Sequence, residues 1–246
     1  MDNVFLTVLR LSENVEIVEI SSIKGTEPRV VAGFAGVGLV GHTAVSHIVR
    51  EKGFKVKAIV KSNLIPPMIV LTDGKPSPSF AVYGDDADET LFAVSNVMIS
   101  PENTWVVGLR LMEWFRKMGA REIVTVEGMP QAVPQGKRPV YGFGVPERDL
   151  SGYGVHTIKE GAASGLNAVL MEEAINGGVP FMNLLVPTSL ASALDLWGSL
   201  SVAEVLNRMC DLDVDVSSLE AKAEMFRPRF QKGNETKGIF GFLRKR

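Results

Sequence analysis

The chain alternates short apolar runs rich in β-branched residues with longer runs in which apolar positions recur every three or four residues. The first pattern predicts buried strands, and the second predicts helices that bury one face. The segment "VVAGF" (30–34), a helix over about 39–52 and "KVKAIV" (55–60) follow one another with short connections. A strand, a helix and a strand in this order form a βαβ unit, which favours a parallel sheet.

The same patterns continue to the end of the chain. A helix is predicted directly after Ser100, with Pro101 in its first turn and Gly119 as its stop. The other expected elements are a hairpin or loop pair within 69–86, strands over 90–99, 121–129 and 180–187, a loop over 130–155 with one short strand, and helices within 159–178, 199–210 and 217–226. The sequence therefore predicts an α/β fold with three layers, in which helices cover both faces of a mostly parallel sheet. We expect a single domain over 1–226 and a flexible basic tail over 227–246.

A glycine-rich stretch, "GFAGVGLVG", joins the first strand to the first helix. Gly36, Gly38 and Gly41 read G-x-G-x-x-G, a spacing typical of a turn that holds a dinucleotide or phosphate. The second strand ends "IVKSNLIPP", without the acidic residue that would bind a ribose, and no G-K-[ST] follows. The alternative is that these glycines and Gly33 permit positive φ and close helix–strand packing, including a subunit contact. We favour packing, and a small anionic ligand remains the alternative.

Acidic and histidine side chains offer further candidates. Glu127 ends a strand, at the edge where α/β enzymes place catalytic acids. It could form an acid–base pair with Asp149 or Asp195, or it could cap a helix or pair with Arg138. His42 and His47 are five residues apart and do not share a helix face, and the third histidine lies in another segment. We therefore expect no metal site, and no cofactor.

The helix after Ser100 is apolar on two opposite faces. One face includes Trp105, and the other carries Val107, Leu111, Trp114 and Met118. Such a helix either lies between a sheet and a neighbouring helix or places one face in an interface. The second alternative predicts that these four residues contact a partner or a second copy of the chain.

Composition and charge narrow the classes of function. Of the 246 residues, 46% are hydrophobic and 22% are charged, which is ordinary for a globular protein, and the one cysteine, Cys210, excludes an intrachain disulfide. No signal peptide or membrane-spanning run is visible, so we expect a cytoplasmic protein. The net charge is −2, but residues 227–246 carry seven basic residues and one acidic residue. This +6 tail follows a body of net charge −8, which is unfavourable for binding nucleic acid.

The tail also contains apolar residues, and it is either a docking peptide or a solubilising extension. As a docking peptide it would contact an acidic partner through Phe240, Phe242, Leu243 and Arg244.

Several segments, taken in order, resemble the proteasome assembly chaperone family, which is common in archaea. They are "GFAGVGLVG", "NLIPPMIVLTDGK", "LRLMEWFRKMGAREIVTVEGMP" and "EGAASGLNAVLMEEAINGGVPFMNLLVP". The resemblance implies a fold like that of nucleoside phosphorylases and hydrolases. It also implies a non-enzymatic chaperone that self-associates and binds proteasome core-particle subunits. The alternative on the same fold is an enzyme that binds a small ligand, nucleotide or nucleoside. The chain departs from the family in ending "FGFLRKR", without the frequent terminal hydrophobic-Tyr-any motif.

Overall fold

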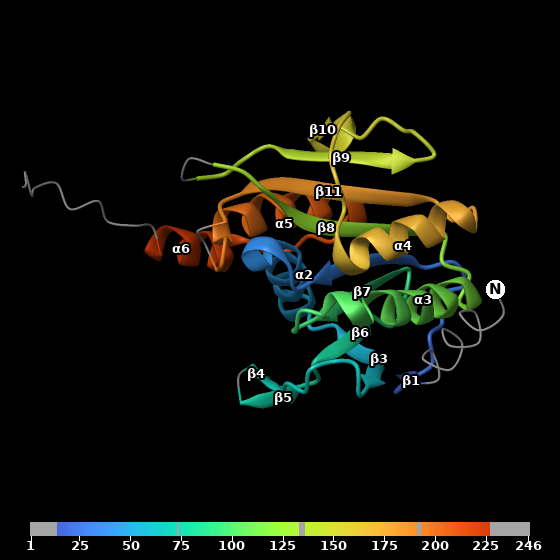
Figure 1. Cartoon of the computed structure of the whole chain (residues 1–246). Helices are drawn as coiled ribbons and strands as arrows, with labels where there is room; N and C mark the ends of the chain where they lie inside the picture. Colours follow the sequence, from blue (N-terminus) through green and yellow to red (C-terminus); the bar gives the residue numbers. More distant parts are fainter. Residues whose placement is uncertain (1–13, 73, 133–135, 191–192, 227–246) are drawn as a thin grey trace, which may run out of the picture.

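The computed structural model describes residues 14–72, 74–132, 136–190 and 193–226. Within them, nine strands form one sheet in the order β1-β3-β6-β7-β2-β8-β11-β9-β10 (Figure 1). These strands are β1 (Val15–Glu19), β2 (Arg29–Phe34), β3 (Lys55–Ser62), β6 (Phe80–Gly84), β7 (Thr90–Ser95), β8 (Glu122–Pro130), β9 (Val140–Val145), β10 (Val155–Thr157) and β11 (Phe181–Thr188). The strands expected around 30–34, 55–60, 90–99, 121–129 and 180–187 are all present.

Parallel strands form the centre of the sheet. The four neighbours β7, β2, β8 and β11 are parallel, whereas β1, β3 and β6 pair antiparallel on one side and β9 pairs antiparallel with β11 on the other. The sheet is therefore mixed, with its parallel part in the middle. The expected βαβ unit is formed by β2 and β3, which run in the same direction but are separated by β6 and β7.

Helices cover both faces of the sheet. One face carries α2 (Val40–Glu51), α5 (Leu196–Cys210) and α6 (Ser217–Met225), and the other carries α3 (Pro101–Lys117) and α4 (Gly165–Asn176). Successive residues of a central strand alternate between the two layers, so that Val30 packs in the α3 layer and Val31 in the α2 layer. The expected three-layer arrangement is confirmed.

The helix predicted after Ser100 is α3, and its surroundings show how its second apolar face is used. Val107, Leu111 and Trp114 are buried in the chain's own core, and Met118 packs against the same cluster. The prediction of a partner contact is therefore wrong for Val107, Leu111 and Trp114, because α3 lies against the sheet beside α4 and uses this face there. The exposed apolar side chain of α3 is Trp105.

A small hairpin stands apart from the main sheet. Its strands, β4 (Val70–Thr72) and β5 (Lys75–Ser77), form a separate two-stranded sheet at the bottom of Figure 1. The hairpin expected within 69–86 is therefore present. Three large apolar side chains in and just before it, Met68, Ile69 and Leu71, are exposed.

Candidate functional site

The glycine-rich turn brings the start of α2 into direct contact with the sheet. A Cβ on Gly33 would lie 2.5 Å from the carbonyl oxygen of Gly41 and 2.5 Å from Cβ of Val45. A Cβ on Gly41 would lie 2.5 Å from the carbonyl oxygen of Val126. All three distances are too short for a Cβ atom, so these two glycines permit the contact of α2 with β2 and β8.

Gly38 connects the same turn to the end of β11 and to the start of α5. It lies in the short 3₁₀ helix η1 (Val37–Leu39) with a φ of 62°, and its Cβ would be 2.5 Å from Cγ2 of Thr188 and 3.0 Å from Cβ of Asp195. Its carbonyl oxygen accepts a hydrogen bond of 2.8 Å from the backbone N–H of Asp195. Gly36 differs, because a Cβ there would meet no atom within 4 Å.

A small cavity of about 150 Å³ lies at the carboxyl ends of β2, β7 and β8, beside the start of α4. Of the residues singled out in the sequence, Gly36, Gly41 and Glu127 line it, whereas Gly33 and Gly38 do not. The rest of its wall is mainly apolar and includes Phe34, Val97, Met98, Ile99 and Leu166.

Glu127 is held at the edge of this cavity by two neighbouring elements. Its carboxylate accepts hydrogen bonds from Nδ2 of Asn183 at 2.9 Å and from Oγ of Ser164, the residue before α4, at 3.3 Å. Burial raises the pKa of Glu127, and these hydrogen bonds act in the opposite direction. Its hydrogen bonds to Ser164 place the carboxylate of Glu127 beside the start of α4, in keeping with the helix-capping alternative.

The other partners considered for Glu127 are engaged elsewhere. Arg138 pairs with Asp195, and both side chains are buried, with exposed fractions of 6% and 7%. Asp195 is also the N-cap of α5, where its Oδ1 accepts a 2.9 Å hydrogen bond from the N–H of Gly198. Asp149 binds the N–H and hydroxyl of Ser151. Glu127 therefore does not pair with Arg138, and among the described residues neither Asp149 nor Asp195 contacts Glu127 as the partner of an acid–base pair.

A second and larger cleft, of about 570 Å³, lies between α2, the β4–β5 hairpin and α6. It was not expected from the sequence, because its walls come from segments far apart in the chain. Apolar side chains such as Phe54, Val70 and Leu219 line it, together with the basic side chains of Arg50 and Lys222.

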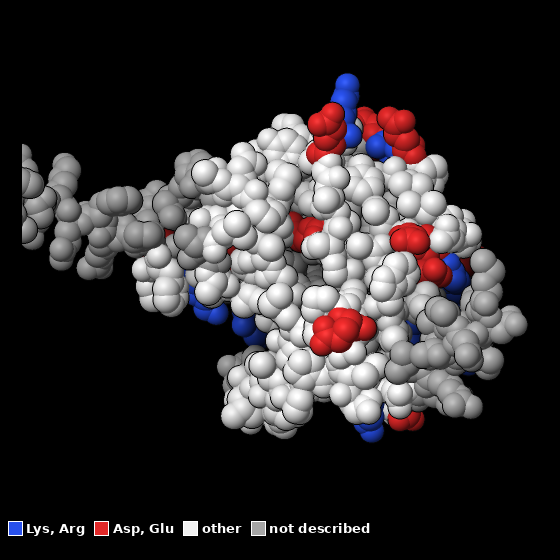
Figure 2. Space-filling view, in the orientation of Figure 1, with Lys and Arg blue, Asp and Glu red and all other residues white. Residues whose placement is uncertain are grey.

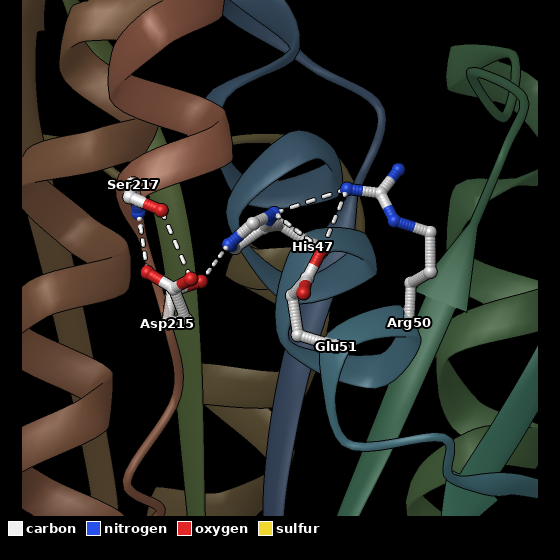
Figure 3. Close-up of polar contacts among 5 residues, drawn as sticks. All are labelled: His47, Arg50, Glu51, Asp215 and Ser217. Carbon is white, nitrogen blue, oxygen red and sulfur yellow. Dashed lines mark hydrogen bonds and ion pairs between the residues drawn. The ribbon is translucent and has the colours of Figure 1, made fainter.

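A polar network centred on His47 borders this cleft (Figure 3). His47 is buried, and its Nε2 lies 2.9 Å from the carbonyl oxygen of Asp215, in the segment before α6. Because a carbonyl oxygen can only accept, Nε2 carries the proton, and Nδ1 accepts from Nη2 of Arg50 at 3.1 Å. The same Nη2 donates to Oε1 of Glu51 at 3.3 Å. Burial lowers the pKa of His47, so its neutral form orients Arg50.

The described part of the chain offers neither a metal site nor a membrane-spanning helix. No three His, Cys, Asp or Glu side chains are grouped there so that they could hold a metal ion. No helix within those residues has the length and hydropathy needed to cross a membrane. The tail residues Phe240, Phe242, Leu243 and Arg244 lie outside the described residues.

Comparison with known proteins assigns the family. A model of the PAC2 family matches residues 30–232. The chain belongs to the PAC2 family. This confirms the resemblance to proteasome assembly chaperones, because the described structure also matches the crystal structure of Pyrococcus furiosus PbaA, an archaeal homolog of proteasome-assembly chaperone. That match has a TM-score of 0.77 and 27% identity, and it covers 86% of this chain and 88% of PbaA.

Two other matches extend the comparison. Pyrococcus furiosus PbaB, titled an archaeal proteasome activator, matches with a TM-score of 0.72 and 21% identity over 86% of this chain and 95% of PbaB. The protein MJ0106 of Methanocaldococcus jannaschii, described as uncharacterized, is 26% identical over 215 residues, which are 86% of this chain and 87% of that protein. The PbaB match supports the fold alone.

Proposed function

We propose that this PAC2 protein is a non-enzymatic assembly chaperone that self-associates and binds proteasome core-particle subunits in the cytoplasm. The observation that carries the proposal is the similarity to PbaA along nearly the whole of both chains. The glycine turn agrees with it, because Gly33, Gly38 and Gly41 are required for packing and need no ligand to explain them.

Exposed apolar side chains supply the contact surface that a binding protein needs. In the hairpin region, Ile69 and Leu71 expose 64% and 69% of their surface. At the end of α6, Met225 and Phe226 are also exposed. Exposed apolar side chains that lie next to one another mark interaction sites, whereas single exposed apolar side chains are common on any protein surface. We therefore assign self-association to the hairpin.

Light scattering tests this assignment on the full chain. The double variant Ile69→Ser/Leu71→Ser removes the hairpin's apolar contacts and should lower the mass in solution toward that of one chain. The matched control, Ile20→Ser/Ile175→Ser, changes two exposed isoleucines elsewhere and should keep the wild-type mass. If both double variants had the same mass in solution, the hairpin would not be part of the interface. If the wild-type protein had the mass of a single chain, self-association would be refuted.

Binding to the proteasome is tested by capturing archaeal proteasome α subunits on the immobilised protein. The full chain should retain them, and a form ending at Phe226 should retain less if residues 227–246 contribute a second contact. Capture by neither form would refute the proposed partner, whereas equal capture by both would assign binding to the body alone.

The cavity beside Glu127 supports a second candidate, a small-ligand or nucleoside-binding enzyme. It unites a half-buried carboxyl group, four glycines and the start of a helix at the carboxyl edge of parallel strands. Its volume of about 150 Å³ is below the roughly 300–1,000 Å³ usual for small-molecule sites, which favours the chaperone. A melting-temperature rise with inosine and phosphate that Glu127→Gln abolishes would support the enzyme, and no rise would refute it.

A further inference from the structure

The cleft between α2, the β4–β5 hairpin and α6 has the size and walls of a small-molecule site. Its volume of about 570 Å³ falls within the usual range of roughly 300–1,000 Å³. Apolar side chains from four segments line it, and they include Phe54, Val70, Leu196 and Leu219. A ligand with an apolar or aromatic body can therefore be buried there.

The charges around the cleft are positive, although the body of the protein is acidic. Arg50 of α2, Lys75 of β5 and Lys222 of α6 line the cleft, and no carboxylate does. Glu51 contacts Arg50 from outside the lining, which leaves a local net charge of +2. Neither lysine has an ion-pair partner within the described part of the chain. Figure 2 shows basic side chains on the left of this face, between the positions of α6 and the hairpin.

Arg50 is already oriented for binding an anion. Its Nη2 is shared between His47 and Glu51, and Nε and Nη1 point away from both partners in Figure 3. A guanidinium group fixed in this way can donate hydrogen bonds to an oxyanion with little loss of side-chain entropy.

Two side chains of α2 that line the cleft, His42 and Ser46, each have a polar atom without a hydrogen-bond partner among the described residues. Asn96 donates from Nδ2 to the carbonyl of Pro78, so its Oδ1 accepts from Nε2 of His42 at 2.7 Å. Nδ1 of His42 is then without a partner among the described residues, as is Oγ of Ser46 one turn further along α2. Buried polar groups are ordinarily paired, and these two are the buried side-chain atoms of the cleft's lining without a partner among the described residues.

We propose that this cleft binds a small phosphomonoester whose phosphate lies among Arg50, Lys75 and Lys222 and whose apolar or aromatic body packs on the apolar wall. A phosphomonoester carries a charge of about −1.5 to −2 at neutral pH, which matches the local +2. The chain's own basic tail does not fit, because its charge has the same sign as that of the cleft. The proposal does not depend on the binding of proteasome subunits, although the cleft shares the β4–β5 hairpin with the surface assigned to self-association.

Calorimetric titration of the full chain with AMP, adenosine and inorganic phosphate tests the proposal. AMP should bind at least about tenfold more tightly than either of the other two, because only AMP carries both the anion and the aromatic body. Raising KCl from about 50 to about 300 mM should weaken AMP binding, since the cations are at the protein surface. No binding at about 5 mM AMP would overturn the proposal. If adenosine bound as tightly as AMP, the basic side chains would have no role in binding. If inorganic phosphate bound as tightly as AMP, the apolar wall would have none.

Matched lysine variants locate the site. Lys75→Gln/Lys222→Gln should weaken AMP binding by about tenfold or more, from the loss of two charge-assisted contacts. Lys61→Gln/Lys159→Gln makes the same charge change at exposed lysines outside the cleft and should leave the affinity unchanged. Glu127→Gln should also leave it unchanged. Loss of binding in Glu127→Gln, or equal affinity in both lysine pairs, would place AMP elsewhere and overturn the proposal.

Discussion

Replacing Gly38 by alanine is the sharpest test of the role of the glycine turn. Gly38 has a φ of 62°, and an added Cβ would lie 2.5 Å from Cγ2 of Thr188 and 3.0 Å from Cβ of Asp195. A non-glycine residue in the left-handed region costs about 1–2 kcal/mol. Forcing an extra carbon into a packed site costs about 1–3 kcal/mol more. We therefore expect Gly38→Ala to lower the free energy of unfolding by about 2–5 kcal/mol.

Gly36 provides a matched control two residues away in the same turn. Its φ of −157° is extended, and a Cβ would meet no atom within 4 Å. Gly36→Ala should therefore leave the free energy of unfolding unchanged or raise it by up to about 1 kcal/mol, because alanine restricts the unfolded chain. The measurement is urea unfolding followed by circular dichroism, with the slope of the transition checked for each variant.

A double variant separates the contact from the backbone conformation. Thr188→Ser removes the Cγ2 that the new Cβ would meet and keeps the hydroxyl that donates to the carbonyl of Val186. In this background Gly38→Ala should cost less than in the wild type, with a coupling of about 0.5–3 kcal/mol. Equal stability of the Gly38→Ala and Gly36→Ala variants would refute the reasoning, and so would the absence of coupling to Thr188.

Two other substitutions test the packing around this turn and the network beside the cleft. Asp195→Ala removes the N-cap of α5 and leaves Arg138 buried without its partner. Urea unfolding should therefore show a free energy of unfolding that is lower by about 3–5 kcal/mol. A decrease below about 1 kcal/mol would contradict the buried pair. Burial lowers the pKa of His47 from its ordinary value of 6.5. As the pH falls, the histidine of the unfolded chain is therefore protonated before that of the folded chain. The stability that neutral His47 contributes is present above pH 6.5 and is lost as the pH falls through the lower pKa of the folded state. His47→Gln should therefore show a shallower decline of unfolding free energy below pH 6.5 than the wild type, and an unchanged decline would contradict the neutral, buried state.

Local patterns were sufficient to predict most elements, because they depend on short-range chemistry. The helix after Ser100 begins at Pro101 and ends before Gly119, as its stop residue predicts. The packing interpretation of the glycine stretch agrees with the close contacts at Gly33, Gly38 and Gly41. It rested on a missing ribose acid and apolar neighbours, which can be read from the sequence. For Gly36 this packing argument fails, since a Cβ there would meet no atom within 4 Å.

Features that join distant segments could not be predicted in this way. The apolar face of α3 that includes Val107 was a candidate interface, because its partner, α4, is more than 50 residues away and its contacts carry no local signal. Arg138 and Asp195 are 57 residues apart, and only the tertiary fold pairs them. Asp195 did have one usable signal, since an aspartate just before an apolar helical run is a common N-cap. The cleft bordered by His47 brings together α2, a hairpin and α6, so its positive charge appears only in the folded chain.

The rate at which proteasome core particles form tests the central claim most directly. Archaeal α and β subunits are mixed with and without equimolar protein, and completed particles are followed by native gel electrophoresis and peptidase activity. The account predicts faster formation or a higher yield of particles with the wild-type chain, and a smaller effect with Ile69→Ser/Leu71→Ser than with Ile20→Ser/Ile175→Ser. Identical assembly with and without the protein would contradict the assignment as an assembly chaperone.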